Sequence, residues 1–211
     1  MADTRRITVT EGLRELKLYD AKIRKAINNG YFVKAGPKSA NNIGGVSKEE
    51  LVKNIKADYQ SVCDLIKNRS LLKQKITQSN ATTSISVDGM EYTVAEAIER
   101  KNSIMYEKML LEDLKTGYLI SYDAMTEQND RVANKIDSML SAFLGKDSDK
   151  KVTAEDLKAI SEPYRISNEW ELLDPLDICA VIKELEAKID GFESAVDTQL
   201  SISNSTTFIE I

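Results

Sequence analysis

Apolar residues recur every three or four positions over most of the chain, which is the pattern of amphipathic helices. The first such stretch begins at Thr8, where Thr8 and Glu11 form a capping-box pattern, and it ends at Asn28-Asn29-Gly30. The second begins at Ser47-Lys48-Glu49-Glu50, another capping-box pattern, and carries apolar positions as far as Ile76. Both stretches therefore predict long helices.

The longest predicted helix begins at a third capping-box pattern, Thr93 with Glu96, and continues to Leu144 with no proline and only Gly117 as a weak point. Apolar residues recur every seven positions along it, and neighbours such as Met105 and Leu114 widen the stripe. We interpret this ladder as an assembly seam, formed by Ile104, Leu111, Tyr118, Met125, Val132 and Met139. A helix of roughly 50 residues is about 75 Å long, which favours an elongated antiparallel helical bundle or coiled coil.

Two connecting regions separate the helices. Residues 31–46 contain glycine, proline and asparagine pairs and predict a flexible loop. Residues 145–173 predict a short helix, from Thr153 to about Ile160, followed by an irregular connector. The last long helix is expected to begin at Asp174-Pro175 and to carry apolar positions to Leu200. We expect residues 1–211 to form a single elongated helical domain.

In two segments, apolar and polar residues instead alternate, which is the pattern of β-strands. Residues 82–94 predict a β-hairpin around Asp88-Gly89, and residues 206–211 predict a C-terminal strand. The sequence of residues 79–87 matches that of residues 203–211, so we interpret them as two copies of a helix-to-strand unit, in which Asn80 and Asn204 end the helices. The predicted fold is mainly α, with a small three-stranded sheet made of the hairpin (83–94) and the C-terminal strand (206–211).

Composition agrees with a folded helical protein. Of the 211 residues, 42% are hydrophobic and 30% charged, whereas only 6% are aromatic, so the core must be mostly aliphatic. The net charge of −5 disfavours nucleic acid as a partner, although the first helix is locally basic. The sequence shows no secretion signal and no apolar run long enough to span a membrane, so Cys63 and Cys179 are expected to be reduced core thiols in a cytoplasmic setting.

Candidate chemistry is sparse because the sequence contains no histidine. This excludes Ser–His and Cys–His catalysis and the Glu-x-x-His motif of di-metal bundles. Asp147-Ser148-Asp149 suggests a calcium loop, but Lys158 occupies the position of the essential glutamate, so a surface turn is favoured. We therefore predict a protein that is not an enzyme, with no catalytic residue, cofactor or metal site.

A family resemblance adds to this interpretation. It is carried by Ile66-Lys67-Asn68-Arg69, by Ser79-Asn80-Ala81-Thr82-Thr83, by Asp88-Gly89 and by the helix start from Tyr92 to Lys101. These motifs resemble the septicolysin-like family of small helical bacterial proteins. The N-terminal start at Arg6-Ile7-Thr8 and the ending Asn204-Ser205-Thr206-Thr207 are similar to phage and prophage proteins of low-GC Gram-positive bacteria. The resemblance implies a virion structural or accessory protein and supplies no catalytic residues.

Together these features lead us to expect a phage virion protein, associated with the capsid or the tail and made in the bacterial cytoplasm. Its partners would be other phage structural proteins and further copies of itself, with no membrane and no nucleic acid. The alternative is a cytoplasmic assembly chaperone or regulatory binding protein that never joins a particle, whose basic first helix would meet a nucleic-acid or acidic partner.

Overall fold

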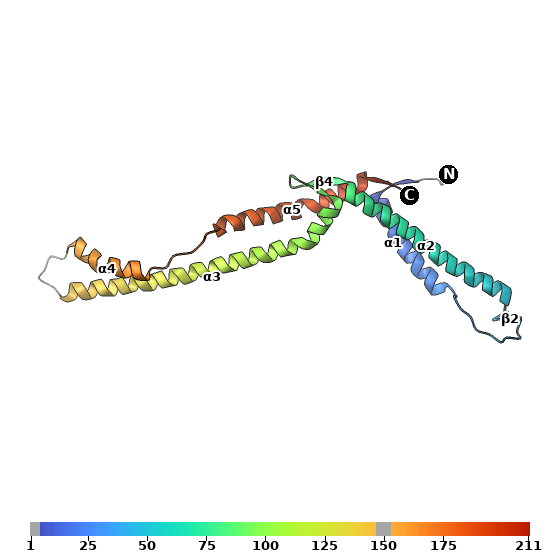
Figure 1. The fold of residues 1–211 in the computed structure, drawn as a ribbon, viewed down its shortest axis with the longest axis horizontal. Helices are drawn as coiled ribbons and strands as arrows, with labels where there is room; N and C mark the ends of the chain where they lie inside the picture. Colours follow the sequence, from blue (N-terminus) through green and yellow to red (C-terminus); the bar gives the residue numbers. More distant parts are fainter. Residues whose placement is uncertain (1–4, 147–152) are drawn as a thin grey trace. The chain divides into compact units, whose positions relative to one another are not determined.

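A computed structural model describes residues 5–146 and 153–211. The chain is mainly α-helical, as predicted (Figure 1). Its helices are α1 (Val9–Asn29), α2 (Lys48–Thr82), α3 (Val94–Lys146), α4 (Ala154–Asn168) and α5 (Ile178–Thr206). Its strands are β1 (Arg6–Thr8), β2 (Asn42–Ile43), β3 (Val46–Ser47), β4 (Ser84–Val87), β5 (Met90–Thr93) and β6 (Phe208–Glu210).

The contacts of the chain divide it into two compact units. The terminal unit combines Met1–Asn102 with Gly191–Ile211, and the middle unit is Ser103–Asp190. Helices α3 and α5 each contribute residues to both units.

The predicted capping pairs begin the helices. The Thr8 hydroxyl accepts a hydrogen bond from the Glu11 amide, and the Glu11 carboxylate accepts one from the Thr8 amide at 2.8 Å. Thr93 and Glu96 repeat this arrangement at the start of α3. In both pairs the hydrogen bonds from threonine lower the pKa of the glutamate below its ordinary value, because they stabilise the carboxylate. Ser47 accepts from the Glu50 amide at the start of α2.

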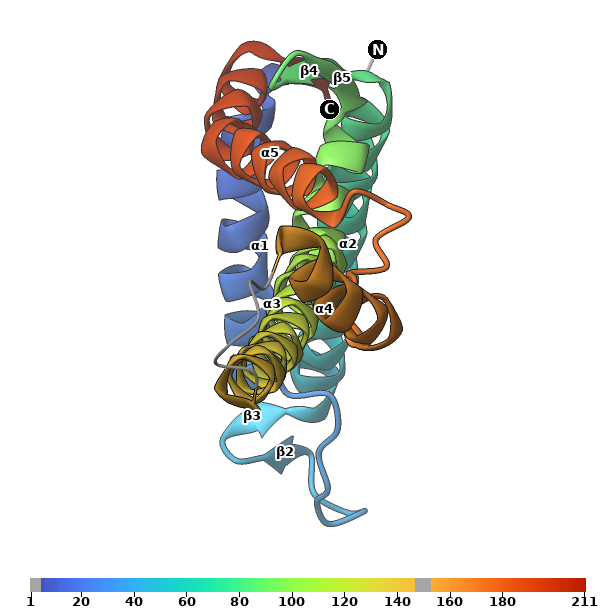
Figure 2. The same cartoon turned by 90° about the vertical axis from the view of Figure 1, so that its left-hand side faces the viewer.

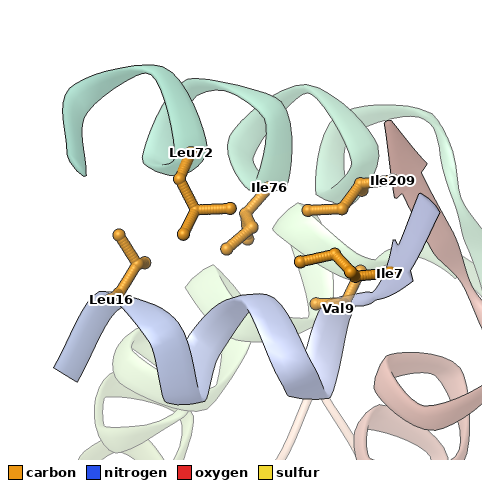
Figure 3. Close-up of a cluster of buried hydrophobic side chains, with 6 residues drawn as sticks. All are labelled: Ile7, Val9, Leu16, Leu72, Ile76 and Ile209. Atoms are coloured by element: carbon orange, nitrogen blue, oxygen red, sulfur yellow. The ribbon is translucent and has the colours of Figure 1, made fainter. Parts of the chain in front are cut away.

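Helices α1 and α2 lie side by side in the terminal unit and share a buried apolar cluster (Figures 1, 2 and 3). The cluster consists of Ile7, Val9, Leu16, Leu72, Ile76 and Ile209. It therefore joins β1, both helices and β6. Gly12 is buried within it, and a methyl group added there would lie 3.2 Å from the Cδ1 atoms of Ile76 and Ile209.

The predicted three-stranded sheet is wrong. Strands β4 and β5 pair only with each other, and β6 pairs with β1 instead, so the described residues contain two-stranded ribbons. Because β1 is only three residues long and runs directly into the capping box of α1, its sequence shows only the helix start. Arg5 and Ile211 exchange two backbone hydrogen bonds of 3.0 Å, so residues near the two ends of the chain are held together.

The two copies of the predicted helix-to-strand unit also pair with equivalent partner strands, which the sequence repeat did not predict. Thr83 donates to Ser79 O and accepts from the Val94 amide, at 2.9 Å each. Thr207 likewise donates to Ser203 O at 2.9 Å and accepts from the Val9 amide at 3.0 Å. The ribbon β6·β1 thus reproduces the ribbon β4·β5, with Ile209 paired to Ile7 as Ile85 is paired to Tyr92. In the first copy, the Asp88-Gly89 turn connects the two strands of the ribbon. In the second copy, β6 and β1 form the same kind of ribbon although no turn connects them.

Several predicted boundaries need correction. Asn80 and Asn204 do not end their helices, which continue to Thr82 and Thr206, where each threonine hydroxyl donates to carbonyls one turn back. Helix α5 begins at Ile178 rather than at Asp174-Pro175. The Asp174 carboxylate accepts from the Ile178 amide across a turn, and Asp177 has a φ of 52°, which interrupts a helix.

The two connecting regions also contain more regular structure than expected. Helix α4 does not stop near Ile160 but continues through Pro163 to Asn168. Within residues 31–46, Asn42 and Ile43 form a strand that turns through Gly44 and Gly45 into β3 (Figure 2). Both glycines have positive φ, as does the Asp88-Gly89 turn predicted between β4 and β5. The surface turn expected at residues 147–149, in preference to a calcium loop, lies outside the described residues.

Candidate assembly surface

The seam predicted on α3 lies entirely in the middle unit. Ile104 is buried, and Leu111, Tyr118, Met125, Val132 and Met139 are all half-buried. None of the six is exposed, so they form a continuous, partly covered stripe along the helix. Ile136, which extends the same stripe, is also buried.

Helix α5 covers this stripe over part of its length. Lys115 forms an ion pair with Glu186, and Lys188 Nζ lies 3.4 Å from Glu107 Oε1. A hydrogen bond with Cys179 raises the pKa of Tyr118 above its ordinary value. Cys179 is exposed, so the prediction that it lies in the core is wrong. Residues later in α3 thus meet residues earlier in α5, so the two helices run antiparallel here. The ion pair with Glu186 likewise raises the pKa of Lys115.

The connector before α5 is attached further along α3. The Asn129 side chain donates to Trp170 O at 3.0 Å and accepts from the Trp170 amide at 2.8 Å. Between α3 and this connector lies an open groove of about 590 Å³, lined by Gly117, Ser121 and Ala124 on one side and by the connector on the other. Trp170 is 53% exposed and Leu173 is 82% exposed, so the rim of the groove is apolar.

A second apolar surface on α3 is left uncovered. Each of its side chains is at least 52% exposed. We name it the outer face, and it consists of Met105, Tyr106, Met109, Leu110, Leu119 and Ile120. At 100° per residue these six centre on the side of α3 opposite the seam. Met105, which was expected to widen the seam, lies instead on this exposed surface.

The outer face is not predicted by the seven-residue ladder, although its residues are visible in the sequence. Helix α3 is apolar on two sides, and the ladder marks only one of them. Which of the two sides is covered depends on where α5 packs, and that contact joins residues far apart in the chain. The additional signal is the paired apolar residues at 105–106, 109–110 and 119–120, which fall outside the ladder.

Basic residues that precede or face the first helix form contacts within the terminal unit. Arg5 forms an ion pair with Glu15, and Arg69 on α2 donates to Asp20. The hydrogen bond from Arg69 lowers the pKa of Asp20. Arg6 stacks over the ring of Phe208, 4.4 Å from its centroid. Arg5 and Arg6 thus hold the start of the chain against α1 and β6.

No family model, curated protein or solved structure matches this chain. Among residues 5–146 and 153–211, no helix combines the length and the apolar character that a bilayer-spanning segment requires.

Proposed function

We propose that this chain is a structural component of a phage particle, associated with the capsid or the tail, that works through protein–protein contacts along α3. The observation that carries the proposal is the imbalance between buried and exposed apolar residues in the middle unit. Among its described residues, three hydrophobic side chains are buried: Ile104, Ile136 and Ile189. The six side chains of the outer face and the rim of the groove remain in contact with water.

Exposed apolar surface of this extent favours association. Removing apolar area from water contributes roughly 25 cal/mol per Å². A monomeric protein seldom leaves a contiguous apolar patch larger than about 300–600 Å² uncovered. A helix pair also covers only one side of each helix, so a further helix is needed to bury the other side. An assembly partner would supply that missing layer.

The first test is the copy number of this chain in purified particles of the phage or prophage that encodes it, measured by quantitative mass spectrometry against the major capsid protein. A fixed stoichiometric number supports a virion component, and its value separates capsid from tail. Abundance in infected cells together with absence from particles would reject the proposal in favour of an assembly chaperone or regulator.

A seam variant tests whether the covered side of α3 serves the same role. Leu111→Asp places a charge at a half-buried apolar position and should destabilise the fold by about 2–3 kcal/mol or prevent incorporation. Leu111→Met keeps the apolar volume, and Thr126→Asp places a carboxylate at an exposed position of the same helix. Both controls should incorporate normally. Normal folding and incorporation of Leu111→Asp would show that the seam has no such role.

A further inference from the structure

The outer face is bare because of the position of α5. Helix α5 contacts the side of α3 that carries Glu107, Lys115 and Tyr118, which is the seam side. The outer face is centred on the opposite side, so α5 does not cover most of it, and Ile120 alone among its six residues also lines the groove beside the connector. Within the described residues of the middle unit, its six side chains remain more than half exposed.

We propose that the outer face binds the outer face of a second copy of this chain, with the two α3 helices antiparallel about a two-fold axis near Glu112 and Asp113. This inference deepens the proposed function and rests on its assembly role, because it names one of the partners. The contact is isologous: the same surface is used by both copies, so it closes after two chains.

The area available matches what a stable dimer needs. Six large apolar side chains, each more than half exposed, offer on the order of 700 Å² per copy. A standard interface uses about 800 Å² per partner. Neighbouring polar side chains on the same side of α3 would add the remainder. The result is a layer of four helices, with α3 and α5 from each copy.

Four of the six apolar residues pair with one another about the two-fold axis, whereas Met109 and Leu110 fall opposite Thr116 and Lys115. Met105 and Tyr106 lie as far before the midpoint between residues 112 and 113 as Ile120 and Leu119 lie after it. In the antiparallel register, Met105 of one copy therefore faces Ile120 of the other, and Tyr106 faces Leu119. Each end of the face is then closed by an apolar pair.

The antiparallel register places acidic residues at the centre of the contact. Asp113 of one copy lies level with Glu112 of the other, and Lys115 is paired with Glu186 of its own chain on the seam side. The contact therefore depends on its apolar residues and not on charge pairing.

The inference is tested by a charge exchange between the full-length chains. Met105→Lys and Ile120→Glu each place a charge against an apolar partner, so each variant alone should dimerise about tenfold more weakly, or less well still, in sedimentation equilibrium. When the two variants are mixed, the lysine introduced in one chain would face the glutamate introduced in the other. The mixed dimer should then regain most of the lost affinity, whereas a parallel dimer would show no such rescue.

The controls separate folding from association. Ile166→Glu changes a 75% exposed residue on α4, outside the outer face, and should leave the dimer intact. Circular dichroism should show unchanged helicity for every variant, and Leu119→Gln serves as a milder change if a charged variant loses helicity. A native chain that stays monomeric up to about 100 μM, a dimer insensitive to both variants, or a mixture without rescue would each overturn the inference.

The inference and the proposed function fail separately. A chain that is monomeric in solution, yet present at a fixed copy number in particles, would reject the outer-face dimer and leave the virion role standing. A dimer with the expected rescue that is absent from particles would reject the virion role and leave the dimer standing.

Discussion

At the scale of single residues, the two glycines Gly12 and Gly117 lie in different surroundings. Gly12 is buried between α2 and β6, where an added methyl group would touch Ile76 and Ile209 at 3.2 Å. Gly117 lies inside α3 with nothing within 4 Å of an added methyl group. Close packing therefore explains the first glycine, and no contact among the described residues explains the second.

This contrast gives opposite effects on stability. Gly12→Leu should lower the free energy of unfolding by about 1–3 kcal/mol, because the larger side chain forces the α1–α2 contact apart. Gly117→Ala is the matched control and should raise it by about 0.5–1 kcal/mol, since alanine loses less entropy in a helix. Urea unfolding followed by circular dichroism measures both. A neutral Gly12→Leu would mean that the cluster around Gly12 is loosely packed.

The ion pair between Asp20 and Arg69 makes the α1–α2 contact sensitive to acid. Because the hydrogen bond from Arg69 lowers the pKa of Asp20 in the folded state, the pair stabilises the fold above the unfolded pKa of about 3.9. That contribution is lost as the pH falls below this value, through the folded pKa.

Asp20→Asn should therefore be less stable than the native chain at pH 7 and equally stable at strongly acidic pH. Arg69→Lys keeps the charge without the planar donor and should fall between the two at neutral pH. Thermal unfolding across a pH series measures the difference. If the difference in stability between Asp20→Asn and the native chain persists at acidic pH, the charge of the Asp20 side chain is not the cause of that difference.

At the scale of elements, much of the fold was readable from local sequence. Thr8 with Glu11 and Thr93 with Glu96 marked helix starts, and Asp88-Gly89 marked the turn between β4 and β5, because each signal lies within a few residues. The partner of β6 was not readable. Its pairing with β1 joins opposite ends of the chain, and no turn connects them to set a register. The packing of α5 against one side of α3 could not be predicted for the same reason, because it joins residues far apart in the chain.

The likeness between the two ribbons predicts a way to stabilise the chain. A backbone closed by Asp-Gly between Ile211 and Arg5 would copy the turn between Val87 and Met90 in register. This closure should raise the free energy of unfolding by about 2–4 kcal/mol, since it restricts the unfolded state. A chain closed by a long Gly/Ser linker is the control and should gain less, because it does not fix the register. If both closed chains gain the same free energy of unfolding, the two ribbons are not equivalent.

At the scale of the whole molecule, the two units bury their apolar residues differently. The terminal unit has a continuous cluster that joins β1, β6, α1 and α2. The described part of the middle unit has three buried hydrophobic side chains and an exposed outer face. We therefore expect the middle unit to gain most from a partner. Copy number in particles and the charge exchange on α3 address this expectation directly.

The ribbon β1·β6 also bears on how the protein is made. Ile7 and Val9 emerge from the ribosome long before Ile209, which packs with them. The cluster around Gly12 therefore stays incomplete, and its apolar side chains accessible, until Ile209 has been translated. Contacts of such long sequence separation form slowly. A nascent chain of this protein would depend on protection from aggregation until Ile209 has emerged.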